Sequence, residues 1–262
     1  MAGNTAVDAN LKKRHTQRQR ARIRAMKRRR VIFFSLLFLT AVLIVMFFTP
    51  VFQIRSVVIE GNERVSTEQI SQAVGEIEGE NLFRTSMRRI RKNLLAIAYV
   101  DTASVKRVAI PPSVKVTVLE CQPAAYIIEN EKYIIINEKG KVLEVSDTIP
   151  EGIPQLAGFS PTVFEPGQEL EIDEQNKYET VLLCITEMQK AGILSGVRLV
   201  SFEDVSNITF NYEDRLDVLC GSEVEFSKKM SLFREAIHSS KLTENSRGTI
   251  DLSVTGKAVY TP

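Results

Sequence analysis

The chain has little of the residue chemistry that most catalytic sites need. It contains only two histidines, His15 and His238, and neither has a candidate nucleophile or metal ligand near it in the sequence. Phosphate-binding glycine loops, Gly-x-Ser-x-Gly elbows and Ser-x-x-Lys acylation motifs are absent. Carboxylate pairs such as Glu223 and Glu225 lie at a helix start, where acids favour the backbone amides. We therefore expect no enzymatic activity, no cofactor and no metal site.

Cysteine is equally scarce. Cys121, Cys184 and Cys220 form an odd set without paired spacing, which excludes a disulfide framework and a zinc site of the usual spacing. Each is flanked by apolar residues. We expect all three to be small buried hydrophobic side chains.

Charge is missing from residues 31–48, which include only two polar side chains, Ser35 and Thr40. As a helix this run spans roughly 27 Å, close to the hydrocarbon thickness of a bilayer. A buried core helix would carry a polar stripe, and this run has none. A cleaved signal peptide would have a shorter apolar run and a small-x-small cleavage site, which Thr49–Phe52 does not offer. The pattern predicts an uncleaved transmembrane helix over residues 31–49.

The two sides of this helix differ in charge. Residues 1–30 carry eleven Lys and Arg and one acid, a net charge of +10, whereas the remainder of the chain carries −8. The positive-inside rule places the basic arm, residues 1–30, in the cytoplasm and the rest outside the membrane, a single-pass type II topology. Anionic lipid is the expected partner of the arm. Nucleic acid is disfavoured because the arm has no aromatic residue on which bases could stack.

Residues 51–121 read as a compact first domain. An alternating strand is expected at 52–60 and ends at Gly61-Asn62, and Ser66 with Gln69 forms a capping box ahead of a short helix. A second helix follows over 85–98, and two strands at 100–109 and 113–120 are separated by two prolines. The order β-α-α-β-β predicts two helices on a three-stranded sheet.

Residues 122–262 form a second domain, which we expect to be a mostly antiparallel β domain with two helices. Short strands are expected at 124–129, 132–137 and 141–145. A helix capped at Asp173 follows a proline- and glycine-rich loop, three further strands extend the sheet, and a last helix runs over 223–239. Two terminal extended segments complete the domain. The whole chain is therefore of the α+β class, with a cytoplasmic arm and one membrane helix. The Gln122-Pro123 junction is too short for a free linker.

The first domain resembles a POTRA domain. The residues that carry the resemblance are the Gly-Asn turn with Val-Ser at 65–66, Gly-x-Asn-Leu-Phe at 79–83, Val-Asp-x-Ala-Ser-Val-Lys-Arg at 100–107 and Pro-Pro-x-Val-Lys-Val-Thr-Val-Leu-Glu at 111–120. A single N-terminal anchor behind a basic arm, followed directly by such a domain, resembles the DivIB/FtsQ family of bacterial cell-division proteins.

This resemblance implies a non-enzymatic divisome scaffold at the division septum of the cell membrane. Its implied partners are the DivIC/FtsB-like and FtsL-like bitopic division proteins and, through them, the septal penicillin-binding protein. A membrane-tethered POTRA component of secretion or a receptor is the main alternative, although tandem POTRA repeats or a large β-barrel would be expected for it. An anchored cell-wall enzyme is disfavoured by the missing acid–base residues.

The last two extended segments are the candidate docking edge, because a sheet edge can accept a partner strand through backbone hydrogen bonds. In the family that the chain resembles, the last strands receive the partner. The alternative is that these strands merely close the sheet and that Tyr260, the candidate aromatic anchor, packs inside. The predicted partner-binding residues are Thr249, Ile250, Asp251, Leu252, Ala258, Val259 and Tyr260.

A second candidate surface is basic. Four cations lie within about one turn of the second helix, and they form either a solvated face near Glu68, Glu76, Glu78 and Glu80 or a contact site for acidic partners or lipid. These possible contact residues are Arg88, Arg89, Arg91 and Lys92.

Overall fold

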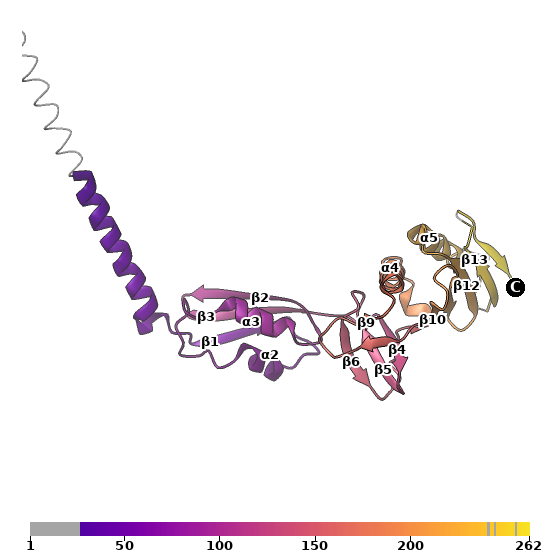
Figure 1. The fold of residues 1–262 in the computed structure, drawn as a ribbon, viewed down its shortest axis with the longest axis horizontal. Coiled ribbons are helices and arrows are strands. Elements are labelled where there is room, and N and C mark those ends of the chain that lie inside the picture. Colours follow the sequence, from indigo (N-terminus) through magenta and orange to yellow (C-terminus); the bar gives the residue numbers. More distant parts are fainter. Residues whose placement is uncertain (1–26, 240–241, 244, 255) are drawn as a thin grey trace, which may run out of the picture. The chain divides into compact units, whose positions relative to one another are not determined.

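The structure, a computed structural model, describes residues 27–239, 242–243, 245–254 and 256–262. Most of the basic arm, including His15, lies outside these residues. Figure 1 shows the order of the elements along the chain, from the N-terminal helix to the C-terminal strands.

The first element is a helix over Lys27–Phe48, long and apolar enough to cross a membrane. Its 22 residues have a mean hydropathy of 2.9 in the most apolar window, and none of that window is buried in the protein. At 1.5 Å per residue the helix measures about 33 Å, sufficient for the hydrocarbon layer. The apolar helix predicted at 31–49 is therefore confirmed, and within the described residues it covers Lys27–Phe48.

The chain separates into two compact units. The first contains the apolar helix, in a segment that ends at Val58, together with Ile77–Ser86 and Arg107–Val114. The second contains Ile59–Glu76, Met87–Lys106 and Lys115–Pro262. This division differs from the boundary expected at residues 121 and 122, which stays a prediction.

A three-stranded sheet has the strand order β1-β3-β2, and it is accompanied by the two expected helices. Helix α2 begins with the predicted capping box, in which Ser66 accepts from the Gln69 N–H and the Gln69 side chain accepts from the Ser66 N–H. Both helices bury one apolar face and contact each other. The elements are β1 Ser56–Glu60, α2 Thr67–Val74, α3 Met87–Leu95, β2 Val100–Ala109 and β3 Pro112–Glu120.

Strand β1 is shorter than the strand expected at 52–60. Pro50–Phe52 form a 3-10 turn, η1, directly after the apolar helix. Gln53 then makes only an isolated bridge to Asn81 before the regular strand begins at Ser56. Proline at the first position fixes the backbone for this turn, which delays the strand.

A nine-stranded sheet has the order β14-β13-β12-β11-β10-β7-β4-β5-β6. Its pairings are antiparallel except for β7 with β4 and β10 and β12 with β13. This confirms a mostly antiparallel β region. Its strands are β4 Ala125–Glu129, β5 Lys132–Ile136, β6 Val142–Ser146, β7 Gln155–Ala157, β10 Val197–Ser201, β11 Ile208–Tyr212, β12 Leu216–Gly221, β13 Gly248–Asp251 and β14 Val259–Thr261. A separate pair consists of β8 Pro161–Val163 and β9 Glu171–Ile172.

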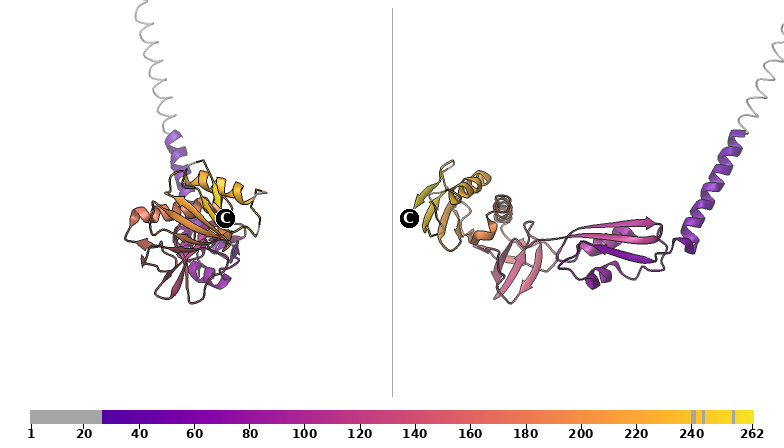
Figure 2. Two further views of the ribbon diagram at one scale, coloured as in Figure 1. Left: turned by 90° about the vertical axis from the view of Figure 1, so that its right-hand side faces the viewer. Right: turned by 180° about the vertical axis from the view of Figure 1, so that it is seen from behind.

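Helices α4 (Gln175–Lys190) and α5 (Phe226–Ile237) share one core with this sheet. Figure 2 shows them beside the sheet in two further views. Phe233 of α5 packs edge-on against Phe210 and Tyr212, with ring centroids 5.1 Å apart in each pair. The predicted cap at Asp173 is wrong, because α4 begins after Glu174 and has no side-chain cap. Glu174 has a non-helical backbone and occupies the cap position itself, so Asp173 lies one residue too early to cap the helix.

All three cysteines are free and buried, as predicted. Burial raises the pKa of Cys121, and it raises the pKa of Cys220 to about 12. Burial also raises the pKa of Cys184, reinforced by Cys220 nearby. The thiols therefore stay protonated and act as core side chains.

Candidate interaction surfaces

Strand β14 lies at one end of the nine-stranded sheet. It pairs antiparallel with β13, with Thr249 opposite Thr261, Ile250 opposite Tyr260 and Asp251 opposite Val259. In the portion of the chain that the structure describes, no strand pairs with the other side of β14. Strand β13 is paired on both sides, so the backbone groups open to another chain belong to β14.

The two faces of this edge differ. Residues directly opposite each other on paired strands point to the same face, so Tyr260 shares the face of Ile250, which is buried in the core. Val259 and Thr261 point to the other face. Val259 is 56% exposed, whereas Tyr260 is 38% exposed and donates its hydroxyl proton to the Arg247 carbonyl at 2.7 Å.

Tyr260 is therefore neither a fully packed core residue nor a fully exposed anchor. Its hydroxyl is hydrogen-bonded within the protein, while part of its side chain is exposed to solvent. Of the other predicted residues, Ile250 and Leu252 are buried, so their side chains belong to the core. Ala258 is exposed and Thr249 and Asp251 are half-buried. The side chain of Val259 is the most exposed apolar group on β14.

Gly248 determines how closely β14 can approach β13. Its φ of +144° lies in a region that residues with a side chain rarely adopt, and a Cβ at this position would lie 2.2 Å from the Thr261 carbonyl oxygen. The Gly248 N–H donates to the Arg215 carbonyl at 3.2 Å. No sequence signal distinguishes this glycine from those in ordinary turns, because Thr261 is thirteen residues away.

The end of β13 is closed by Asp251, whose Oδ1 accepts from the Ser253 N–H at 2.8 Å. Hydrogen bonds from the side chain and backbone of Ser253 hold the pKa of Asp251 below its ordinary value. Asp251 is therefore ionised at neutral pH and fixes the turn that leads towards β14.

The four cations of helix α3 are exposed, as a solvated face requires. Ile90 and Leu94 on the opposite side of the helix are buried. Among the ion pairs of residues 27–239, none joins Arg88, Arg91 or Lys92 to an acid. The cluster stays a predicted contact site for an acidic partner or lipid.

Side chains that could bind a metal are also located in the residues that the structure describes. Within them, no group of three His, Cys, Asp or Glu side chains is placed to hold a metal ion. His238 follows the end of α5, where its backbone N–H bonds to the Arg234 carbonyl. The sites that the structure brings together are a sheet edge and a basic helix face.

Comparison with known proteins agrees with this architecture. The sequence profile described as "POTRA domain, FtsQ-type" matches residues 52–120. The cell division protein DivIB of Clostridium acetobutylicum is 24% identical over 214 residues, which cover 80% of this chain and 83% of that protein. The cell division protein FtsQ of Corynebacterium glutamicum is 25% identical over 183 residues, 68% of this chain and 76% of that protein.

The chain is a relative of the DivIB and FtsQ cell-division proteins. Among solved structures, one that resembles this chain is the major extracytoplasmic domain of DivIB from Geobacillus stearothermophilus. The match covers 47% of this chain and 98% of the solved DivIB chain, at 17% identity and a TM-score of 0.33. That score is too low to establish a common arrangement. In this chain, the FtsQ-type POTRA profile corresponds to the three-stranded sheet with α2 and α3.

Proposed function

We propose that the chain is a non-enzymatic scaffold of bacterial cell division that captures other bitopic division proteins outside the membrane. Its curated relatives are cell-division proteins, which supports a role in division. The single observation that carries the scaffold proposal is the open edge at β14, which leaves a row of backbone donors and acceptors for one more strand.

The chemistry of this edge defines its partner. An added strand would form backbone hydrogen bonds to Val259–Thr261 and would present an apolar side chain to the exposed face of Val259. The DivIC/FtsB-like and FtsL-like proteins are our proposed partners, and through them the septal penicillin-binding protein. Capture of these proteins couples the chain to septal peptidoglycan synthesis.

A scaffold role also fits the state of the nucleophilic side chains. The cysteine thiols are buried and their pKa values are raised by burial, so none is available as a nucleophile at neutral pH. The activity of the proposed scaffold therefore rests on binding.

The proposed topology puts the docking edge outside the membrane. The net charge of +10 in residues 1–30 favours a cytoplasmic N-terminus, and the folded region then lies on the outer side, enriched at the septum. The basic arm would contact anionic lipid on the cytoplasmic side.

A matched pair of valines tests the proposal. Val259 on β14 and Val254 in the preceding loop are exposed to similar extents, 56% and 60%. We expect Val259→Asp to reduce capture of the division proteins and to impair division in cells that depend on this chain, whereas Val254→Asp leaves both unchanged. Fluorescent fusions should show midcell enrichment of the parent protein, alongside a deletion of residues 249–262 checked for membrane insertion. A uniform membrane signal for the parent, with normal division in the deletion, would refute the scaffold function.

A further inference from the structure

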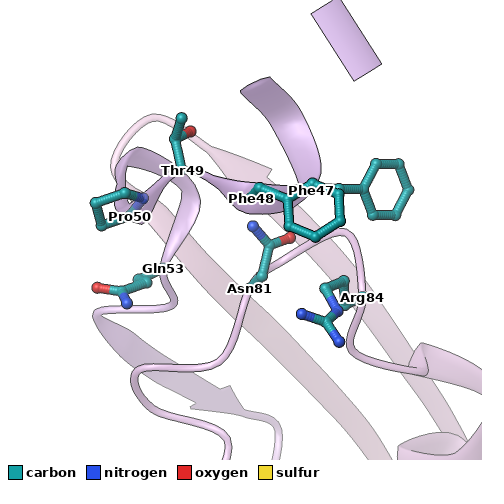
Figure 3. Close-up of a pocket in the computed structure, with 7 residues that line it drawn as sticks. All are labelled: Phe47, Phe48, Thr49, Pro50, Gln53, Asn81 and Arg84. Carbon is teal, nitrogen blue, oxygen red and sulfur yellow. The ribbon is translucent and has the colours of Figure 1, made fainter. Parts of the chain in front are cut away.

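A pocket of about 240 Å³ lies at the C-terminal end of the apolar helix Lys27–Phe48 (Figure 3). It belongs entirely to the first unit, and no acid lines it. The side chains drawn in Figure 3 come from the helix end, from the turn η1 and from the loop that contains Asn81. The lining residues are Phe47, Phe48, Thr49, Pro50, Gln53, Asn81 and Arg84.

Asn81 ties its loop to the membrane helix. Its Nδ2 donates to the Met46 carbonyl at 3.0 Å, one of the last carbonyls of the helix and therefore without a partner inside it. Its Oδ1 accepts from the Phe83 N–H at 3.0 Å. The Phe83 ring packs against Phe52 with centroids 5.1 Å apart, and against Phe47 at 6.4 Å. The pocket wall is thus fixed to the end of the helix.

Arg84 supplies the positive charge of the pocket. The nearby charged groups have other partners. The Glu80 carboxylate accepts from the Thr85 hydroxyl. Arg107 of β2 donates to the carbonyls of Leu82 and Thr85, at 2.8 Å each. Among the ion pairs of residues 27–239, none includes Arg84. Its guanidinium is exposed, and its planar set of donors matches the oxygens of a phosphate group.

The first unit, which contains Arg84, also exposes apolar side chains. Phe48 ends the membrane helix and Val51 follows it, and both are mostly exposed. Ile110, in the turn between β2 and β3 and in the same unit, is 90% exposed. Residues at the end of a membrane span lie near the lipid headgroups, and cations there meet lipid phosphates.

We propose that this pocket binds the phosphate of an anionic phospholipid in the leaflet next to the folded region. Arg84 and Asn81 face the headgroup, while Phe48, Val51 and Ile110 lie among the glycerol and upper acyl groups. The lipid then holds the first unit against the membrane surface. This site is separate from the docking edge, so it stands or falls independently of the proposed scaffold function.

The chain has no tryptophan, which allows a local test. The full chain with Ile110→Trp is reconstituted in nanodiscs of phosphatidylcholine with a small share of acyl-chain spin-labelled lipid, either phosphatidylglycerol or phosphatidylcholine. We expect quenching of the tryptophan by both labels. The charged lipid should quench more strongly, with an enrichment of about fivefold for one basic residue near anionic lipid. A Val224→Trp protein, which carries its probe on an exposed valine of the other unit, is the control.

Arg84→Gln in the Ile110→Trp background should remove the preference for phosphatidylglycerol, whereas Lys106→Gln, which changes an exposed cation of β2, should keep it. The basic arm does not confuse this readout, because spin labels quench only at short range. Equal quenching by the two lipids in the starting protein, or a preference that survives Arg84→Gln, would overturn the proposal. So would loss of the preference when inorganic phosphate is added, since the site would then serve a soluble anion.

Discussion

The three-stranded sheet and the last two strands of the nine-stranded sheet are held by different kinds of interaction. At the end of β3, the Glu120 carboxylate accepts from the backbone N–H groups of Glu63, Arg64 and Val65, with the nearest distances at 2.9 Å. Strand β14 is held instead by its pairing with β13 and by the hydroxyl of Tyr260. Side-chain bracing uses up backbone donors, whereas an open strand leaves them available. The first region is braced by side chains, and the second is the region that we propose accepts a partner.

The largest expected effect is at Gly248, and it should break docking without unfolding the protein. A valine there would place its Cβ against the Thr261 carbonyl and would require a positive φ that β-branched residues avoid. We expect Gly248→Val to displace β14 and to weaken partner binding by about tenfold or more, which corresponds to about 1.4 kcal/mol.

Gly256→Val is the matched control, because Gly256 also has a positive φ, +78°, but nothing lies within 4 Å of its Cβ position. Partner binding by the two variants can be compared by co-purification from membranes. Equal losses would show that backbone strain, rather than the position of β14, determines docking.

A substitution at the opposite end of the nine-stranded sheet should lower the stability of the folded protein. Lys141, next to β6, donates to the carbonyls of Leu95, Ile97 and Val100 at 3.2, 3.0 and 2.8 Å. Burial lowers the pKa of this lysine, yet the three acceptors satisfy its ammonium.

Lys141→Met would leave these carbonyls without their donor. We expect a loss of about 1–3 kcal/mol in the free energy of unfolding, measured by urea titration in detergent. Lys139→Met, which removes an exposed ion pair to Asp101, should cost less than about 1 kcal/mol. A similar cost for both would mean that Lys141 does not brace this end of the sheet.

The region around Glu120 should also be recognisable by the pH dependence of its contribution to stability. Burial alone would raise the pKa of Glu120, but the backbone N–H groups of Arg64, Val65 and Glu63 outweigh it and hold the pKa below the ordinary value of 4.5. A carboxyl group with a lowered pKa in the folded protein stabilises it at pH values above about 4.5, and this contribution is lost as the pH falls through the folded pKa.

Glu120→Gln should therefore reduce stability by about 1 kcal/mol at pH 7, and the difference from the parent should vanish in strong acid. Thermal unfolding of both proteins between pH 7 and pH 3 tests this. A difference that does not change with pH would show that the charge of Glu120 makes no contribution.

The smallest effect concerns the thiols. Since burial raises their pKa values, we expect iodoacetamide at pH 8 to modify none of the three cysteines in the folded protein and all three after denaturation. Intact mass spectrometry counts the adducts. Rapid modification of Cys220 in the folded chain would show that the core near β12 opens.

The sequence predicts local features well and long-range contacts poorly. The capping box of Ser66 and Gln69 depends on residues three positions apart, and it is confirmed. The roles of Asn81 and Lys141 depend on carbonyls 35 and at least 41 residues away, so no spacing rule could reveal them. Tyr260 could be chosen from the sequence as a candidate aromatic anchor, but only the pairing with Ile250 shows which face it joins.

Photocrosslinking in dividing cells tests the central claim most directly. A photoreactive residue replaces Val259 on β14 or, as the control, Ile128, an exposed apolar side chain on β4. The account predicts that the probe at position 259 crosslinks to a DivIC/FtsB-like or FtsL-like protein and that the probe at position 128 does not. Crosslinks at 128 with none at 259, in a chain that supports division, would contradict docking at the β14 edge.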